Sequence, residues 1–97
     1  MYKILFFLHK TADINLVNFF NEKIVAKLSE ITGKVVETAE IESNLLLDQK
    51  YSLYCEISAN EKEVMDRLMN SKAGKELNKE LTDFHNNLTV ITVNYKN

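Results

Sequence analysis

The sequence predicts an α+β fold of the ferredoxin-like type, in which four strands form one antiparallel sheet and both helices cover the same face. The first observation behind this prediction is the order of the hydrophobic periodicities, which run strand, helix, strand, strand, helix, strand and so repeat one β-α-β unit. The second is that the 97 residues include no Pro and only two Gly, so no flexible linker divides the chain. We therefore expect a single domain over residues 1–97.

Four segments have the two-residue periodicity of strands. They are Tyr2–Lys10, Lys34–Glu42, Tyr51–Ser58 and Leu88–Lys96. In the first strand Phe6 and its even-numbered neighbours are apolar on one side, and Leu5 and Phe7 are apolar on the other. The last strand is also apolar on both sides, through Leu88, Val90, Ile91 and Val93. Both strands are therefore expected to have two buried faces.

In the third strand, one set of alternating side chains is expected to contact the helices. This set is Tyr51, Leu53, Cys55 and Ile57. The alternate set, which includes Tyr54 and Glu56, then lies on the helix-free face. The second strand alternates less cleanly, and we place its Thr38 and Glu40 on the helix-free face.

Helical spacing of apolar residues occurs in Asp13–Thr32 and Asn60–Phe84. Asp13 is the expected N-cap of the first helix, and Gly33 stands where a left-handed residue would end it. At the start of the second helical region, Asn60 and Glu63 have the spacing of a capping box. Farther on, Ser71 is a second candidate N-cap, so this region is expected to break near Asn70 into two pieces.

The charge and the cysteine content exclude several classes of protein. With 12 basic and 14 acidic residues the net charge is −2, and no stripe of Lys or Arg suits a phosphate backbone, so nucleic acid is not an expected partner. A single Cys55 indicates a reducing compartment, and we expect a cytoplasmic protein. The apolar run Ile4–Leu8 is too short for a secretory signal or a membrane span, so no membrane partner is expected.

The helix-free face of the predicted sheet would expose its apolar side chains to water. Such a patch is larger than monomeric proteins usually tolerate. A second copy, packed sheet against sheet around a two-fold axis, would cover it. The sequence therefore predicts a homodimer.

Several short motifs occur in the order found in a known family. They are Phe7-Leu8-His9-Lys10, Asp13 opening a helix, Ser71-Lys72-Ala73-Gly74 followed by Leu77, Leu81 and Phe84, and Val90-Ile91-Thr92-Val93. Together they resemble the EthD-like family of dimeric α+β barrels over nearly the whole chain. In that family a Ser-Pro-x-Gly turn starts the last helix, and Lys72 replaces the Pro here. The family's His-x-Pro segment late in the first helix is absent from Lys23-Ile24-Val25-Ala26, so the resemblance implies no chemistry that depends on that His.

The resemblance implies a homodimer with a cavity between sheet and helices or at the barrel centre. The wider superfamily includes cofactor-independent monooxygenases, small-molecule isomerases and haem proteins, so the fold alone selects no reaction. We expect no cofactor. The residues His9 and His85 have no Cys or carboxylate at a recognised metal spacing, so no zinc or haem site is expected.

The candidate catalytic residues are His9, Tyr54 and Glu56, which would transfer a proton to a ligand or orient it. Each also has a simpler interpretation. His9 is more often solvated or hydrogen-bonded at a strand end, and Tyr54 would equally suit a dimer interface. Glu56 either faces Glu40 across a cavity, which would raise one pKa, or pairs with Lys3 or Lys50 on a solvated edge.

Side chains expected to line the ligand cavity are Phe7, Thr38, Glu40 and Tyr95. The connection between the second and third strands holds three consecutive leucines, Leu45, Leu46 and Leu47. They form a dimer contact in the interpretation we favour, and a gate over the cavity in the alternative.

Two functions from different classes follow. In the first, the protein is a cofactor-independent enzyme, of the oxygenase or isomerase type, acting on a small apolar or aromatic molecule in a barrel cavity. In the second, it is a non-catalytic homodimeric module that binds a small ligand or serves assembly alone. A cavity on which His9, Tyr54 or a Glu converges would favour the enzyme.

Overall fold

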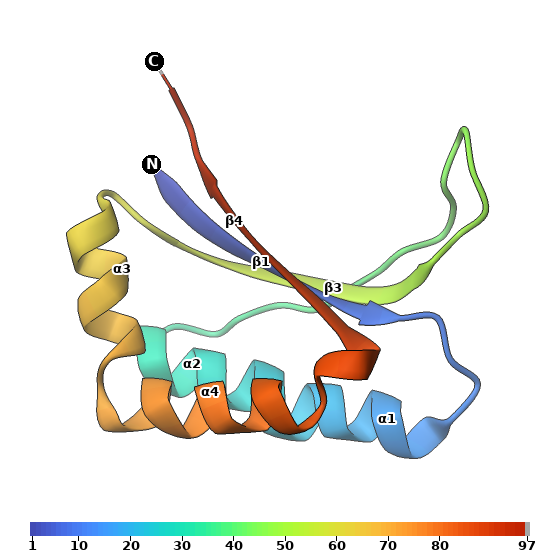
Figure 1. The fold of residues 1–97 in the computed structure, drawn as a ribbon, viewed down its shortest axis with the longest axis horizontal. Coiled ribbons are helices and arrows are strands. Elements are labelled where there is room, and N and C mark those ends of the chain that lie inside the picture. Colours follow the sequence, from blue (N-terminus) through green and yellow to red (C-terminus); the bar gives the residue numbers. More distant parts are fainter. Residues whose placement is uncertain (97) are drawn as a thin grey trace.

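The computed structural model describes residues 1–96 and contains four strands and several helical segments. The strands are β1 (Tyr2–His9), β2 (Ala39–Glu40), β3 (Tyr51–Ala59) and β4 (Leu88–Asn94). The helical segments are α1 (Ile14–Phe19), the π-helix η1 (Phe20–Val25), α2 (Ala26–Thr32), α3 (Lys62–Met69), α4 (Lys72–Asp83) and the 3-10 turn η2 (His85–Asn87). Their order confirms the predicted α+β fold (Figure 1).

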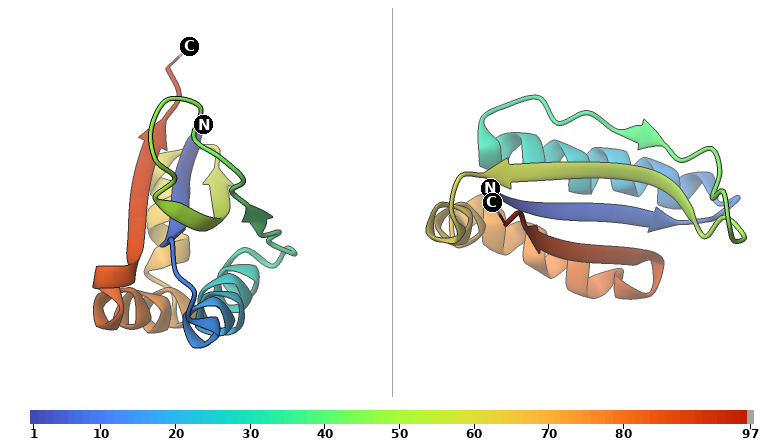
Figure 2. Two further views of the ribbon diagram at one scale, coloured as in Figure 1. Left: turned by 90° about the vertical axis from the view of Figure 1, so that its right-hand side faces the viewer. Right: turned by 90° about the horizontal axis from the view of Figure 1, so that it is seen from above.

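The strands form one sheet in the order β2-β3-β1-β4, and every neighbouring pair is antiparallel. This is the order of the ferredoxin-like split β-α-β fold. The helices α1, α2 and α4 lie below the sheet, α3 stands at one end of it, and the other side of the sheet is uncovered (Figures 1 and 2). The molecule therefore has two layers and one open sheet face.

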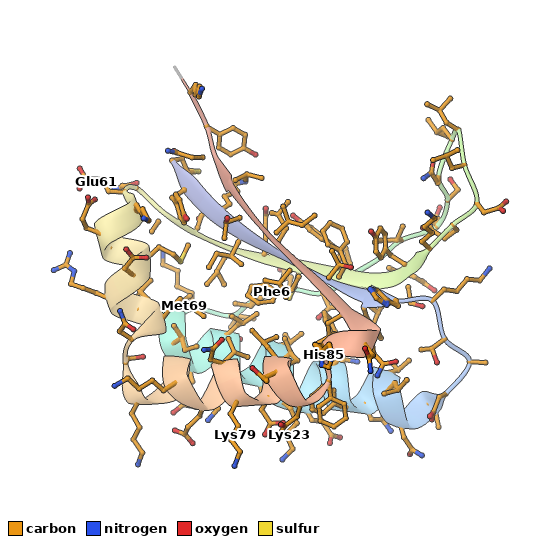
Figure 3. The ribbon with its side chains drawn as sticks, viewed as in Figure 1. Phe6, Lys23, Glu61, Met69, Lys79 and His85 are labelled. Atoms are coloured by element: carbon orange, nitrogen blue, oxygen red, sulfur yellow. The ribbon has the colours of Figure 1, made fainter. Side chains whose placement is uncertain are left out.

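The core lies between the sheet and the helices. On β1 the side chains of Ile4, Phe6 and Leu8 are buried, and Phe6 points from the sheet toward the helices (Figure 3). From the helices come Phe20, Ile24, Leu28, Ile31, Met65 and Leu77. Within this core Cys55, opposite Phe6 in the register, is also buried. The predicted inward face of β1 is thus confirmed.

The register contradicts one predicted face of β3. A shift in the pairing between Leu8 and His9 sets Tyr51 directly opposite His9, on the open face. The side chains of Leu53, Cys55 and Ile57 face the helices as expected, but Tyr51 does not. The physical reason is the bulge, because one extra residue inverts the alternation beyond it.

The second strand is much shorter than the predicted Lys34–Glu42. Ala39 and Glu40 pair with β3, and after them the N–H of Ile41 donates to the Ser52 carbonyl at 2.9 Å. Before them the chain follows the end of α2, where the backbone N–H of Val36 donates to the Ser29 hydroxyl at 3.0 Å. Because this bond satisfies a donor that a sheet would otherwise use, residues 34–38 stand away from β3.

The placement of Glu40 on the open face was wrong. The residue directly opposite it is Leu53, which faces the helices, whereas Ala39 lies opposite Tyr54. Residues opposite each other in an antiparallel pair point to the same face. The Glu40 side chain therefore lies on the helix side at the exposed edge of the sheet.

The first helical region begins and ends as predicted. The Asp13 carboxylate accepts from the N–H of Asn15 at 2.9 Å, and Gly33 has the left-handed conformation, with φ of 69°. Between these ends the π-helix η1 was not predicted, and it buries Phe20 and Ile24 toward the sheet.

The second helical region breaks at Asn70, as predicted, and Ser71 starts its second piece. The Ser71 hydroxyl accepts from the N–H of Gly74 at 3.1 Å and donates to the Leu68 carbonyl at 2.6 Å. The predicted capping box of Asn60 and Glu63 was wrong, because the N-cap is Glu61 in an extended conformation without a side-chain hydrogen bond. The helix starts one residue later because the Glu61 carbonyl accepts its first bond, from Met65.

Candidate functional site

A cleft of about 820 Å³ lies along the outer edge of β3. It exists because residues 34–38 leave the sheet, so the half of β3 from Glu56 onward has no strand beside it on that side. The cleft reaches both faces of β3, since Glu56 and Ile57 both line it. Val64 and Leu68 of α3 close its end.

Two of the candidate catalytic residues meet in this cleft. The Tyr54 hydroxyl donates to Glu56 Oε2 at 2.7 Å, and Lys3 Nζ lies 3.3 Å from Glu56 Oε1. Tyr54 and Glu56 are two residues apart on β3, so their side chains point to the same face. Lys3 reaches them from β1. The pairing of Glu56 with Lys3, one of the two interpretations of this Glu, is the one observed.

The environment keeps Tyr54 protonated. Burial, and then the hydrogen bond to the Glu56 carboxylate, raise the pKa of Tyr54 well above its ordinary value of 10.0. The phenol therefore remains a hydrogen-bond donor to Glu56 even at alkaline pH, where an ordinary Tyr would ionise. The Glu56 carboxylate has one protein partner on each oxygen and keeps lone pairs for a further donor. The pair is suited to holding a ligand hydroxyl or to accepting its proton.

An aromatic cluster lies beside the pair on the open face. The ring of Phe7 is 5.1 Å from that of Tyr54 and 4.9 Å from that of Tyr51, measured between centroids. Phe7 itself does not line the cleft. The cluster instead forms a half-buried apolar surface at the middle of the open face.

His9 lies at the other end of the sheet. Its Nε2 is 2.7 Å from the hydroxyl of Thr89, and its ring is 6.0 Å from that of Tyr51. It does not line the cleft. The hydrogen-bonded interpretation of this His is the one observed. His85 is exposed at the turn before β4 and contacts the Thr82 carbonyl at 2.9 Å (Figure 3).

The predicted cavity residues divide between different places. Thr38 lines the cleft. Glu40 does not line it, and its side chain lies on the face of the sheet opposite to Glu56, so the predicted Glu40–Glu56 pair does not form. Tyr95 is 54% exposed and its ring lies 5.4 Å from Lys3 Nζ. Tyr95 therefore lies beside the site, next to Lys3.

Sequence reasoning missed the cleft wall formed by Val64 and Leu68 and the edge formed by residues 34–38. Their apolar character was visible, but nothing in their spacing indicates that the second strand ends early. The signal for the Tyr54–Glu56 contact was present, since alternation alone puts the two side chains side by side on one face of β3.

Within residues 1–96, no group of three or more His, Cys, Asp or Glu side chains is arranged to hold a metal ion. None of the helices in the same range is long and apolar enough to cross a membrane.

Cys55 is a structural thiol. Burial, with a smaller effect of the Glu56 charge, raises the pKa of Cys55 from 9.0 to about 12. Since the folded state holds the proton more tightly than the unfolded state, the stability from this group is complete below pH 9 and is lost as the pH rises toward 12.

Between pH 9 and 12, we expect the difference in free energy of unfolding between the wild type and Cys55→Ala to shrink by up to about 1.4 kcal/mol per pH unit. Urea unfolding at pH 8, 10 and 11 measures it. A difference that stays constant with pH would contradict the prediction.

No protein-family model matches the sequence, and no curated protein matches it. Among solved structures, an EthD family protein from Bacillus halodurans is 20% identical, covers 99% of both chains and has a TM-score of 0.78. A protein from Arabidopsis thaliana is 18% identical over 99% of this chain and 93% of its own, with a TM-score of 0.63.

A third structure, 5-chloro-2-hydroxyhydroquinone dehydrochlorinase from Burkholderia phenoliruptrix, is 9% identical over 99% of this chain and 94% of its own, with a TM-score of only 0.46. The Bacillus halodurans and Arabidopsis thaliana structures match the fold of this chain over 99% of its length. This protein therefore has the fold of the EthD family protein, which confirms, at the level of the fold, the resemblance drawn from its sequence.

Proposed function

We propose that the protein is a homodimer that binds a small, largely apolar molecule in the β3 cleft and transfers a proton to or from it without a cofactor. The observation that supports this most is the hydrogen-bonded pair of Tyr54 and Glu56 on the wall of the cleft. The cleft wall combines aliphatic side chains, such as Val36 and Leu68, with polar ones such as Thr38, so a ligand would find both apolar contacts and hydrogen-bonding partners there.

The chemistry that suits these residues is an isomerisation. The Glu56 carboxylate takes a proton from a ligand carbon that lies between a carbonyl and a C=C bond, and the electron pair of that C–H bond moves into the dienolate. Glu56 then returns the proton to the far carbon of the former C=C bond, so the double bond shifts into conjugation with the carbonyl and no oxidant or reductant is needed. Lys3 and Tyr54 hold the carboxylate in place at 3.3 Å and 2.7 Å.

The homodimer is supported by the open sheet face. The aromatic rings of Phe7, Tyr51 and Tyr54 lie on it, and on β4 the side chain of Ile91 is 43% exposed. A second copy packed on this face would remove these groups from water. The aromatic cluster and the distance of His9 from the cleft also favour the second candidate, a binding or assembly module without catalysis.

Native mass spectrometry of the purified protein is the first test. A dimer that carries additional non-covalent mass supports the cleft as a ligand site and identifies the molecule. A monomer would contradict the homodimer.

Replacement of Glu56 by Gln is expected to weaken binding of the molecule so identified by about 10- to 100-fold, because a charge-assisted hydrogen bond is lost. Titration calorimetry measures the affinity, with Glu22→Gln, at an exposed position on η1 outside the cleft, as the matched control. For the enzyme, turnover should also fall in Glu56→Gln. Turnover that survives in the double variant His9→Ala, Glu56→Gln would exclude both side chains from proton transfer and favour the binding module.

A further inference from the structure

The loop between β2 and β3 ends in an exposed apolar tip. Leu45, Leu46 and Leu47 are 93%, 91% and 68% exposed. We call these three residues the leucine arm. The loop rises on the open-face side of the sheet, past the end of β1 and away from the helices (Figure 1). Within residues 1–96, the arm therefore has no surface of its own subunit to pack against.

The leucine arm has a defined conformation. The Asn44 side-chain oxygen accepts from the N–H groups of both Leu46 and Leu47, at 3.0 Å each. At the base of the loop the Gln49 side chain donates to the Ile41 carbonyl at 3.3 Å and accepts from the N–H of Tyr51 at 3.2 Å. Because the loop is shaped in advance, less conformational entropy is lost when the arm binds a surface.

The charges around the arm disfavour a lipid surface. Residues 41–49 contain Glu42 and Asp48 and no Lys or Arg. An anionic bilayer attracts basic segments and repels acidic ones. A protein surface with apolar side chains is the better match.

Such a surface lies at the opposite end of the sheet. The β3 cleft has a wall of aliphatic side chains, Val35, Val36, Val64 and Leu68, and Val35 is 88% exposed. The cleft is bordered by α3 and by Met1, which lie at the end of the molecule away from the leucine arm (Figures 1 and 2). An arm and a cleft at opposite ends of one subunit cannot contact each other within it.

We propose that the leucine arm of one subunit packs against the aliphatic wall of the β3 cleft in a second copy, and so completes the ligand site of that copy. Two sheets packed face to face, with a two-fold axis across their strands, put each arm at the cleft end of the other subunit. This arrangement covers the open face, both arms and both clefts in one association. It rests on the homodimer proposed above, and it makes the site a composite of two chains.

Disulfide crosslinking tests the contact directly. Val35→Cys and Leu46→Cys are both made at exposed positions, where folding is insensitive to the change. Equal amounts of the two single variants, one of them labelled with ¹⁵N, are mixed, allowed to exchange subunits and oxidised mildly. Buried Cys55 stays unreactive. The expected product is the mixed Val35→Cys with Leu46→Cys dimer, in at least tenfold excess over dimers of either variant with itself.

Two results would overturn the proposal. If Leu46→Cys couples mainly with itself, the arms meet each other instead of the clefts. If the wild type is a dimer in sedimentation but neither variant crosslinks, the arm lies outside the interface. A wild type that sediments as a monomer contradicts the homodimer itself, which keeps the two failures distinct.

A charged arm should weaken the dimer. Leu46→Asp is expected to raise the dimer dissociation constant at least tenfold, because a carboxylate loses its water when it enters an aliphatic wall. The matched control is Ile14→Asp, the same change at a 64% exposed aliphatic residue at the start of α1, on the helix side. Analytical ultracentrifugation measures both. Equal constants for the two variants would contradict a role for the arm.

Discussion

Replacing Phe6 with Ala is expected to lower the free energy of unfolding by about 3–5 kcal/mol, which is a large fraction of the total stability of a domain of this size. Phe6 is 1% exposed, lies in the middle of β1 and points into the core between sheet and helices (Figure 3). Its neighbours across the sheet are Cys55 and Val90. Removing the ring leaves a cavity that the surrounding strands and helices cannot close.

Urea unfolding of Phe6→Ala measures the loss, and the next residue provides the control. Phe7 is on the opposite face of the same strand, half-buried against Tyr51 and Tyr54. Phe7→Ala should cost much less at concentrations where the protein is monomeric, and should weaken the dimer. Equal losses in the two variants at low concentration would contradict the assignment of Phe7 to the open face.

The second large effect is expected at Gly74, on the first turn of α4. A Cβ at this position would collide with the Met69 carbonyl oxygen and lie 2.7 Å from that of Leu68. Both oxygens belong to the backbone of α3, so the collision cannot be relieved by rotating a side chain (Met69 is labelled in Figure 3). Gly74→Ala should therefore push the two helices apart and lower stability by about 3 kcal/mol or more.

Gly33→Ala is the matched control for Gly74→Ala. Gly33 has a φ of 69°, and a Cβ there would meet nothing within 4 Å. Its substitution carries only the cost of a left-handed conformation, about 1 kcal/mol. In thermal unfolding each kcal/mol shifts Tm by about 4–8 °C for a domain of this size. If the Gly74→Ala variant has the same Tm as Gly33→Ala, then α3 and α4 can move apart at little cost in free energy, and the prediction is wrong.

The Ser71-Lys72-Ala73-Gly74 segment shows why the break between α3 and α4 could be predicted from the sequence. The Ser71 hydroxyl caps α4 at the N–H of Gly74, and the absence of a side chain at Gly74 lets α4 start directly against the end of α3. Both roles depend on neighbours within a few residues. The break between the two helices was therefore predictable from the sequence.

The candidate site was predictable only in part. Tyr54 and Glu56 are two residues apart on one strand, so their side chains share a face. That relation depends on the local backbone alone and could be predicted. Their partner Lys3 and the cleft beside them depend on the register of β1 against β3 and on where β2 ends. Glu40 was misplaced because the second strand had no clean alternation to define its faces.

The sequence by itself determined the order of the elements, their caps at Asp13, Gly33 and Ser71, and the inward face of β1, because each follows from spacing within one segment. Only the tertiary structure decided the bulge that turns Tyr51 to the open face and the early end of β2 that opens the cleft. The physical reason is competition between distant partners. The Ser29 hydroxyl accepts a hydrogen bond from the N–H of Val36, which a longer strand would have used in the sheet. No sequence pattern within residues 34–42 predicts that contact.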